Sequence, residues 1–388
     1  MKISQPTISQ IKGRTTVAAH VSTEKTGLNR PEKLYFSTQS TGPESFSTRG
    51  DAFVAGLLPV AMRLGESLDV DAPVSTRLAH GLEHYQDILT TWWPHFFHRS
   101  NIRYSSLVER TDESRPDAVG CCFSGGVDSF QAVAGLRMPA IRFPEFEITH
   151  ALMINGFDQV MDLDHGGVSQ QMYEAYSPAL AQWGIELVMV DTNLKLFKEA
   201  VMTKTHLWAS FGGSLTACAH ALSSLFGRFN LPAQATYAYP DLRPVGSHPM
   251  LDHLLGTDQL QVIHTGARIS RARKLEALAD HSVVRDNLRV CFRNPEFDLE
   301  SGAVINCGKC EKCIRTIISL DILGRLDDFS TFPNRPPMRM LSDSRLLARI
   351  PIIFLKDILE LAKRQQRGGW VKILEQAVAI RNTKFRST

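Results

Sequence analysis

The segment Ser124 to Ser129, with the sequence SGGVDS, joins a short apolar run to an amphipathic stretch. The run at 118–123 predicts a buried strand, and the stretch at 127–137 predicts a helix. Adjacent glycines tolerate positive φ angles, so the backbone N–H groups of such a turn converge at the start of the helix. The segment therefore predicts either a phosphate-binding loop or a strand-to-helix turn whose glycines serve packing.

The complete six-residue pattern favours phosphate binding over a plain turn. Ser124 and Ser129 offer hydroxyl hydrogen bonds to phosphate oxygens, and Asp128 offers a carboxylate to Mg²⁺, directly or through water. The pattern lacks the Gly-Lys-Ser/Thr of a Walker A loop and the three-glycine spacing of a dinucleotide fingerprint. A kinase-like NTPase and a dehydrogenase are therefore both disfavoured.

From about residue 117 onward, short apolar runs alternate with helical stretches. This alternation is typical of a mostly parallel sheet connected by crossover helices. We expect an α/β fold with a five-stranded, mostly parallel sheet and helices on both faces. After the first strand and helix, the expected strands are 150–154, 186–190, 235–239 and 260–264, and the expected helices are 168–183, 212–227 and 271–280.

Three regions are expected along the chain. Residues 1–115 form an α+β extension or cap, with a strand at 33–38 and helices at 51–65 and 74–93. Residues 116–325 form the nucleotide domain, which includes the cysteine-rich stretch 291–313. Residues 326–388 form a helical tail, interrupted at Pro351 and at Gly368 and Gly369.

The overall composition is that of an ordinary globular protein. The 388 residues include 43% hydrophobic and 21% charged residues, with a formal net charge of +3. This charge is too small to argue for nucleic-acid binding, although the tail from 363 to 388 is basic. No apolar run is long enough to span a membrane, and the N-terminus lacks a secretory signal, so we expect a cytoplasmic protein. The oligomeric state stays open between a monomer and a homodimer.

Four of the seven cysteines cluster near the C-terminal third of the chain. Cys291, Cys307, Cys310 and Cys313 have the spacing C-x15-C-x2-C-x2-C. Four thiolates complete a tetrahedral Zn²⁺ shell with no open position, which predicts a structural zinc site. A redox pair and an iron–sulfur cluster are the competing interpretations. The other cysteines, Cys121, Cys122 and Cys218, are expected to be buried small hydrophobic residues.

The loop at 124–129 resembles that of the PP-loop superfamily of adenine-nucleotide alpha-hydrolases, which have an HUP-type fold. The resemblance implies that ATP and Mg²⁺ bind at Ser124, Gly125, Gly126, Val127, Asp128 and Ser129. It also implies cleavage between the α and β phosphates, adenylation of a carboxyl or carbonyl oxygen, and displacement of AMP by a nucleophile. Adenosine would then lie at the ends of later strands, near Asn155 and Asp191, although both could equally be turn residues.

The loop together with the downstream cysteines resembles the 7-cyano-7-deazaguanine synthase (QueC) family of queuosine biosynthesis. The resemblance covers residues 117–320 and includes Arg315 and the sequence Lys274-Leu275-Glu276. It implies an ATP-dependent ligase that adenylates 7-carboxy-7-deazaguanine, after which ammonia gives an amide and then a nitrile. The long extensions in front and behind have no counterpart in that family. Similar proteins with extensions resemble anti-phage components that join the deazaguanine acyl group to a protein amine. A tRNA-modifying PP-loop enzyme and a non-catalytic nucleotide-binding scaffold are further alternatives.

Other polar residues follow the last expected strands. Arg243 and His248 could contact a substrate carboxylate or phosphate, and His248 could instead cap a helix. Arg271 and Lys274 form a basic turn after the fifth expected strand. We expect Lys274 to be catalytic, facing ATP or the acyl-adenylate, and Arg271 to contact the substrate.

Overall fold

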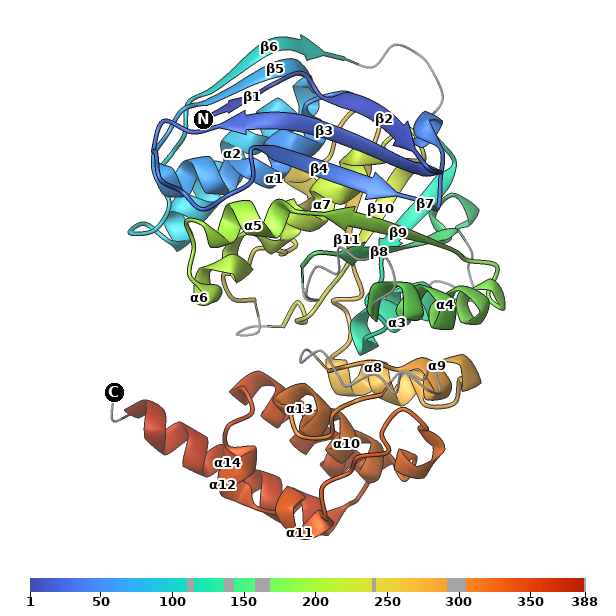
Figure 1. Ribbon diagram of the computed structural model, residues 1–388. Coiled ribbons are helices and arrows are strands. Elements are labelled where there is room, and N and C mark those ends of the chain that lie inside the picture. Colours follow the sequence, from blue (N-terminus) through green and yellow to red (C-terminus); the bar gives the residue numbers. More distant parts are fainter. Residues whose placement is uncertain (110–114, 136–142, 158–167, 239–241, 292–304, 387–388) are drawn as a thin grey trace.

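An eleven-stranded mixed sheet forms the centre of the computed structural model (Figure 1). The structure describes residues 1–109, 115–135, 143–157, 168–238, 242–291 and 305–386. The strand order is β11-β10-β7-β8-β9-β4-β3-β1-β5-β6, and β2 pairs with β3. An α/β fold is confirmed, but the expected sheet of five strands is wrong in size, because strands of the N-terminal region join the same sheet.

Five neighbouring strands of this sheet are parallel to one another. They are β7 (Ala118–Cys122), β8 (His150–Asn155), β9 (Glu186–Thr192), β10 (Phe226–Pro232) and β11 (Gln261–Thr265). The first of them, β7, lies in the middle, with β8 and β9 on one side and β10 and β11 on the other. The strand order reverses at β7, and in open parallel sheets ligands bind at such a switch point.

The fourth parallel strand differs from its predicted position. The sequence predicted a helix through residue 227 and a strand at 235–239, whereas the helix ends at Ala221 and the strand is Phe226–Pro232. The apolar residues at 222, 225 and 226 have helical spacing, but Phe226, Phe229 and Leu231 are buried in the sheet core. Residues 235–238 lie in a loop instead, where Tyr237 N donates to Ala267 O at 3.0 Å.

The N-terminal strands continue the sheet beyond β9. They are β1 (Lys2–Ile3), β2 (Thr7–Ile11), β3 (Arg14–Ser22), β4 (Lys33–Thr38), β5 (Leu68–Ser75) and β6 (Ile102–Val108). The junction is antiparallel, with Phe36 opposite Thr192 and Ser37 opposite Asp191. The first thirty residues have weak apolar patterning, and three strands lie there that the sequence did not predict.

Helices cover both faces of the sheet and form two separate cores. One core includes side chains of α1 (Asp51–Leu64), α2 (Thr76–Trp92), α5 (Leu194–Glu199) and α7 (Phe211–Ala221). The other includes α3 (Val127–Gly135), α4 (Val168–Ala181), α8 (Arg271–Leu278), α9 (Ser282–Asn287) and α10 (Glu311–Leu323). Successive side chains of β7 point to opposite faces of the sheet, so Cys121 belongs to the second core and Cys122 to the first.

Four helices follow residue 337, pack on the second core and lie below α8 in Figure 1. They are α11 (Met338–Leu341), α12 (Ser344–Leu347), α13 (Ile352–Arg364) and α14 (Gly368–Arg386). The short helices elsewhere are α6 (Lys204–Leu207), η1 (Pro43–Ser45), η2 (Pro144–Phe146), η3 (Trp208–Ser210), η4 (Asp252–Leu255) and η5 (Leu326–Asp328). Among the described residues, no helix is long and apolar enough to cross a membrane.

Asn193, directly after β9, fastens the N-terminal strands to the parallel ones. Its buried side chain accepts a hydrogen bond from Tyr35 N at 3.1 Å and donates one to Lys33 O at 2.8 Å. Both partners belong to β4, so one side chain bridges backbone groups at the junction of β4 and β9.

We predict that Asn193→Ala lowers the free energy of unfolding by about 1–2 kcal/mol, because the buried side chain loses two hydrogen bonds to partly buried backbone groups of β4. Urea unfolding followed by circular dichroism measures this change. The control Asn101→Ala removes an exposed asparagine that precedes β6 and should change stability by less than about 0.5 kcal/mol. Equal stability of the two variants would contradict the role given to Asn193.

Candidate functional site

The loop Ser124–Ser129 lies at the carboxyl end of β7, as the sequence predicted, and leads into α3. Ser129 Oγ accepts from Ser124 N at 3.3 Å and donates to Gly126 O at 3.0 Å, which closes the turn. Gly125 has a φ of 71°, and a Cβ there would lie 2.0 Å from Tyr176 Oη. Glycine is therefore required at 125 both by backbone conformation and by the close approach of α4.

Asp128, in the first turn of α3, is surrounded by cations. Arg271 Nη1 donates to one carboxylate oxygen, and Lys274 Nζ donates to the other at 3.1 Å. Burial on its own would raise the pKa of the Asp128 carboxyl, but the charges of Arg271 and Lys274 outweigh it and lower the pKa. The structure therefore brings three predicted site residues together. Binding of Mg²⁺ by Asp128 stays a prediction, since both oxygens already have cationic partners.

Lys274 is held at this position by a second contact. Its Nζ donates to Ala233 O at 2.6 Å, just past β10, and the side chain is 1% exposed. Gln131 lies beside it, because a Cβ on Gly266 would be 2.6 Å from Gln131 Oε1 and 3.6 Å from Lys274 Nζ. Residues following β7, β10 and β11 therefore meet at one edge of the sheet, as expected for the carboxyl ends of parallel strands.

Two further arginines, Arg289 and Arg315, lie in this region. Neither was predicted from the sequence to contact a ligand. Arg315 is 5% exposed, pairs with Glu311 at 3.1 Å and lies over the Phe354 ring at 3.8 Å. Burial and the nearby charge of Arg271 lower the pKa of Arg315 to about 10. Arg289 is 7% exposed, and its backbone N donates to Gly125 O at 2.7 Å. The signals in the sequence were their positions two residues from a cysteine of the predicted metal site and, for Arg315, its place in the cysteine motif that carries the family resemblance.

The polar atoms of this region are not all paired. Among the described residues of this region, buried side-chain atoms without a hydrogen-bond partner belong to Arg289 (Nε), Arg315 (Nε), Tyr176 (Oη) and Gln131 (Oε1). Native proteins rarely leave buried polar atoms unpaired, so each needs an explanation such as an absent ligand or water. Three of the four are donors, which fits an anion carrying several acceptor oxygens.

Asn155 and Asp191 lie at the ends of β8 and β9 and are opposite each other in the sheet register. Asn155 Nδ2 donates to Asp191 Oδ1 at 2.8 Å, and Asn155 Oδ1 is buried with no hydrogen-bond partner among the described residues. Asp191 also forms an ion pair with Arg14 of β3. The sequence gave no signal for Arg14, because it is 177 residues away from its partner.

Arg243 and His248 lie in different environments, His248 in the protein interior and Arg243 at the surface. His248 is buried, with its ring 4.9 Å from that of Trp92, and its Nδ1 accepts from Met250 N at 3.1 Å. Burial lowers the pKa of His248. The bond from Met250 N lies in the turn before η4, whose N-cap is Leu251 without a side-chain cap, so the expected capping role is not confirmed. Among the described residues, no contact joins His248 to Asp128. Arg243 is exposed and lines a surface pocket.

This pocket has a volume of about 420 Å³ and lies between α13 and the loops that follow β10 and β11. Its charged lining residues are Arg243, Arg268, Lys356, Asp357, Glu360 and Arg364. Ser270 also lines it and accepts from Arg273 N at the start of α8, next to Arg271. Asp357 joins α13 to α8 by accepting from Ala272 N at 2.7 Å. The pocket therefore lies close to the cations around Asp128, and its volume is that of a small-molecule site.

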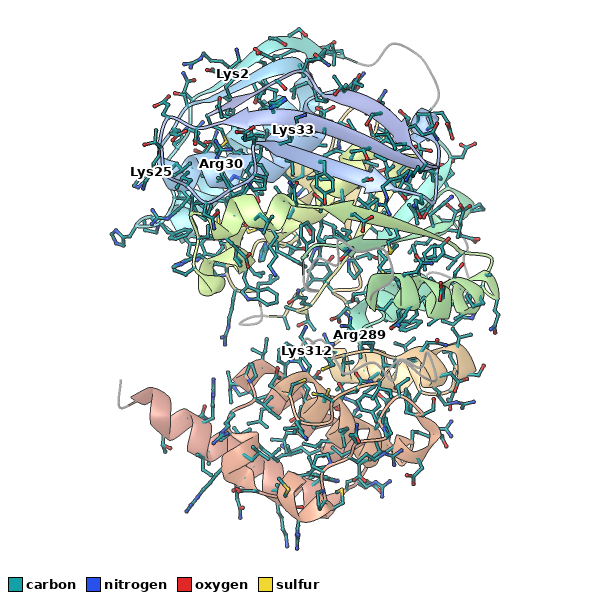
Figure 2. The ribbon with its side chains drawn as sticks, in the orientation of Figure 1. Lys2, Lys25, Arg30, Lys33, Arg289 and Lys312 are labelled. Carbon is teal, nitrogen blue, oxygen red and sulfur yellow. The ribbon has the colours of Figure 1, made fainter. Side chains whose placement is uncertain are left out.

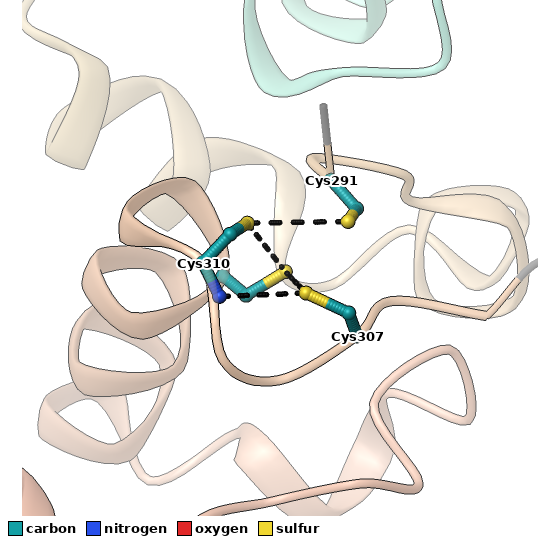
Figure 3. A group of neighbouring side chains, drawn as sticks. Cys291, Cys307 and Cys310 are labelled. Atoms are coloured by element: carbon teal, nitrogen blue, oxygen red, sulfur yellow. Dashed lines mark hydrogen bonds between the residues drawn. The ribbon is translucent and has the colours of Figure 1, made fainter. Parts of the chain in front are cut away.

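The four predicted cysteines form a cluster in which all sulfur atoms lie within 4.8 Å of one another. Cys310 Sγ lies 3.3 Å from Cys313 Sγ and 3.9 Å from Cys291 Sγ, and the sulfur atoms of Cys307 and Cys313 are 3.8 Å apart. Figure 3 shows the sulfur atoms of Cys291, Cys307 and Cys310 directed toward one another. Tetrahedral zinc with bonds of about 2.3 Å requires sulfur atoms roughly 3.8 Å apart, so this donor set fits Zn²⁺.

The backbone around the cluster also favours thiolates. Cys310 N donates to Cys307 Sγ at 3.4 Å, and a backbone N–H directed at sulfur stabilises the thiolate form of Cys307. Gly308 has a φ of 67°, and a Cβ there would lie 1.6 Å from Asn334 O. A side chain at 308 would therefore disrupt the turn that joins Cys307 to Cys310.

Comparison of the chain with protein-family models, with curated proteins and with solved structures gives no match. The geometry of the site, rather than a relative, is therefore the basis for a functional inference.

We predict that Cys310→Ser reduces the zinc content from about one ion per chain to a small fraction and lowers Tm, because three ligands hold a structural ion poorly. Elemental mass spectrometry and thermal unfolding measure the two effects. Cys218→Ser is the matched control, since Cys218 is a buried free cysteine in α7 and should leave the zinc content unchanged. Purified wild-type protein that contains iron or no metal would contradict the zinc assignment.

Proposed function

We propose that this chain is an ATP-dependent ligase that activates a carboxylate as an acyl-adenylate and transfers the acyl group to nitrogen. The observation that supports it most strongly is the SGGVDS loop at the end of β7, bordered by four largely buried cations. These cations are Arg271, Lys274, Arg289 and Arg315. The triphosphate of ATP carries the negative charge that such a site lacks.

Cleavage between the α and β phosphates follows from this arrangement. A substrate carboxylate oxygen attacks the α-phosphorus, the bond from phosphorus to the α–β bridging oxygen breaks, and pyrophosphate leaves with the electron pair. The loop N–H groups with Lys274 and Arg271 stabilise the charge that develops on pyrophosphate. A nitrogen nucleophile then attacks the acyl carbon, the bond to AMP breaks, and the nitrogen loses a proton to solvent. A Mg²⁺ ion bound with ATP would neutralise part of the phosphate charge.

The pocket beside α13 is the proposed site of the acyl substrate. Arg243 and Arg268 there can pair with a carboxylate, and the exposed ring of Tyr237 can stack on a planar heterocycle. The resemblance to the QueC family favours 7-carboxy-7-deazaguanine as substrate and ammonia as nucleophile. The zinc cluster has four cysteine ligands and no open position, so its proposed role is structural.

A protein amine is the second candidate for the nucleophile. One wall of the pocket is α13, which lies beyond the part of the chain that resembles the QueC family. The pocket is also open to the surface, since Arg243 and Tyr237 are exposed. Because α13 extends the pocket and the pocket is open to solvent, the acceptor it favours is larger than ammonia.

We predict that the purified protein releases AMP when given ATP, Mg²⁺, 7-carboxy-7-deazaguanine and ammonium. Asp128→Asn should lower AMP formation by roughly 100-fold or more, because the loop loses the charge that orders Arg271 and Lys274. Mass spectrometry of nucleotides and products is the measurement, and circular dichroism checks the fold. Asp71→Asn, which changes an exposed carboxylate of β5 paired with Lys2, is the control.

The pattern of products separates the candidates for the nucleophile. A nitrile or amide product supports ammonia, whereas AMP without either product directs the search to a mass increase on a protein amine. If the wild-type protein forms no AMP with any deazapurine carboxylate, the proposed ligase activity is wrong. Undiminished AMP formation by Asp128→Asn would remove the role given to the loop.

We predict that Arg243→Gln raises KM for the acyl substrate by about tenfold or more, since a charged hydrogen bond contributes about 1.5–3 kcal/mol. The KM for ATP and the kcat should stay the same, because Arg243 lines the pocket and has no described contact with the phosphate loop. Steady-state kinetics with each substrate varied in turn measures these values. The control Arg77→Gln removes an exposed arginine of α2. A rise in the KM for ATP alone would reassign the pocket to the nucleotide.

A further inference from the structure

The segment from Leu288 to Cys291 connects the phosphate loop to the cysteine cluster. Arg289 N donates to Gly125 O at 2.7 Å, which joins the segment to the loop. Val290 N and Cys291 N both donate to Asn306 Oδ1, at 2.8 and 3.1 Å. Cys291 is itself a member of the cluster. Three consecutive residues, 289–291, therefore link the cluster to the loop.

Asn306 is the residue that fixes this segment. It is fully buried, and its Nδ2 donates to Leu288 O at 2.8 Å and to Thr331 O at 3.1 Å. Its backbone N donates to Thr331 O at 2.8 Å. Every hydrogen-bonding atom of the side chain is used, and the next residue, Cys307, is another cysteine of the cluster. Asn306 therefore fixes the position of the Cys291 backbone relative to that of Cys307.

The side chain of Arg289 lies beside the phosphate loop without a partner for its Nε in the described part of the chain. Figure 2 shows Arg289 beside α3 and α8, where the sheet region meets the C-terminal helices. Its neighbour Tyr176 has an unpaired Oη, which lies against Gly125. The positive charge of Arg289 offsets part of the rise that burial causes in the pKa of Tyr176. A buried guanidinium whose Nε has no partner among the described residues, next to a phosphate loop, is arranged to receive an anion.

We propose that Arg289 binds the β or γ phosphate of the nucleotide and that the metal cluster positions it through Cys291 and Asn306. This inference rests on the proposed binding of ATP at residues 124–129. Metal occupancy and nucleotide affinity are then coupled, and thermodynamic linkage makes the coupling reciprocal. The metal has a positioning role in nucleotide binding in addition to its structural one.

The first test measures binding of α,β-methylene ATP with Mg²⁺ to the metal-loaded protein by titration calorimetry. Arg289→Met should weaken binding by about tenfold or more, because a charge-assisted hydrogen bond is lost. Arg289→Lys should restore part of the affinity, and the control Arg285→Met, in α9, should bind as wild type does. No binding by wild type sinks the proposed function and this inference together. Equal binding by wild type and Arg289→Met overturns this inference alone.

The second test measures zinc affinity by competition with a chromogenic chelator, with and without the nucleotide analogue at saturating Mg²⁺. The analogue should strengthen zinc binding by up to about tenfold in wild type and by no measurable factor in Arg289→Met. That variant also controls for direct binding of zinc by the analogue. An unchanged zinc affinity in wild type, or an equal gain in both proteins, overturns the positioning role of the cluster. The comparison holds whether or not the metal-free chain stays folded.

Discussion

Four cationic side chains lie largely buried beside the phosphate loop. Arg271 and Lys274 share the single carboxylate of Asp128, while Arg289 has an unpaired Nε. Arg315 adds a fourth cation, and Asp128, Glu311 and Asp357 are the acids near them. Burying unmatched charge is costly, so this arrangement is stable only if the surrounding structure holds the cations together. A bound polyphosphate would remove that cost.

The cysteine cluster helps to hold two of these cations in place, one on each side of it in the sequence. Arg289 lies two residues before Cys291, and Arg315 lies two residues after Cys313. A metal ion bound at the cluster would therefore fix the backbone that follows Arg289 and the N-terminal end of α10, which carries Arg315. The C-terminal helices add to the support, because Phe354 of α13 lies under Arg315 and Asp357 accepts from the first turn of α8. Removal of metal would loosen both arginines at once.

Local patterns predicted the parts of the site that are continuous in sequence. The loop at 124–129 and the C-x2-C steps each bring their ligand atoms together over a few residues, so spacing alone predicts them. Contacts between distant segments were not predictable in this way. The ion pair of Arg14 with Asp191 joins strands of the N-terminal and parallel parts, and the β4–β9 junction has no signal in either strand. The shift of the fourth parallel strand to 226–232 has the same origin, because burial between neighbouring strands prevailed over helical spacing.

Binding of inorganic pyrophosphate tests the central claim most directly, because it probes the phosphate loop and its cations without requiring the acyl substrate or its acceptor. Titration calorimetry of the metal-loaded chain with Mg²⁺ and pyrophosphate should give saturable binding that weakens as salt is added, and AMP should bind more weakly than pyrophosphate. Tighter binding of AMP than of pyrophosphate, or no binding of pyrophosphate at all, would contradict a polyphosphate site at residues 124–129.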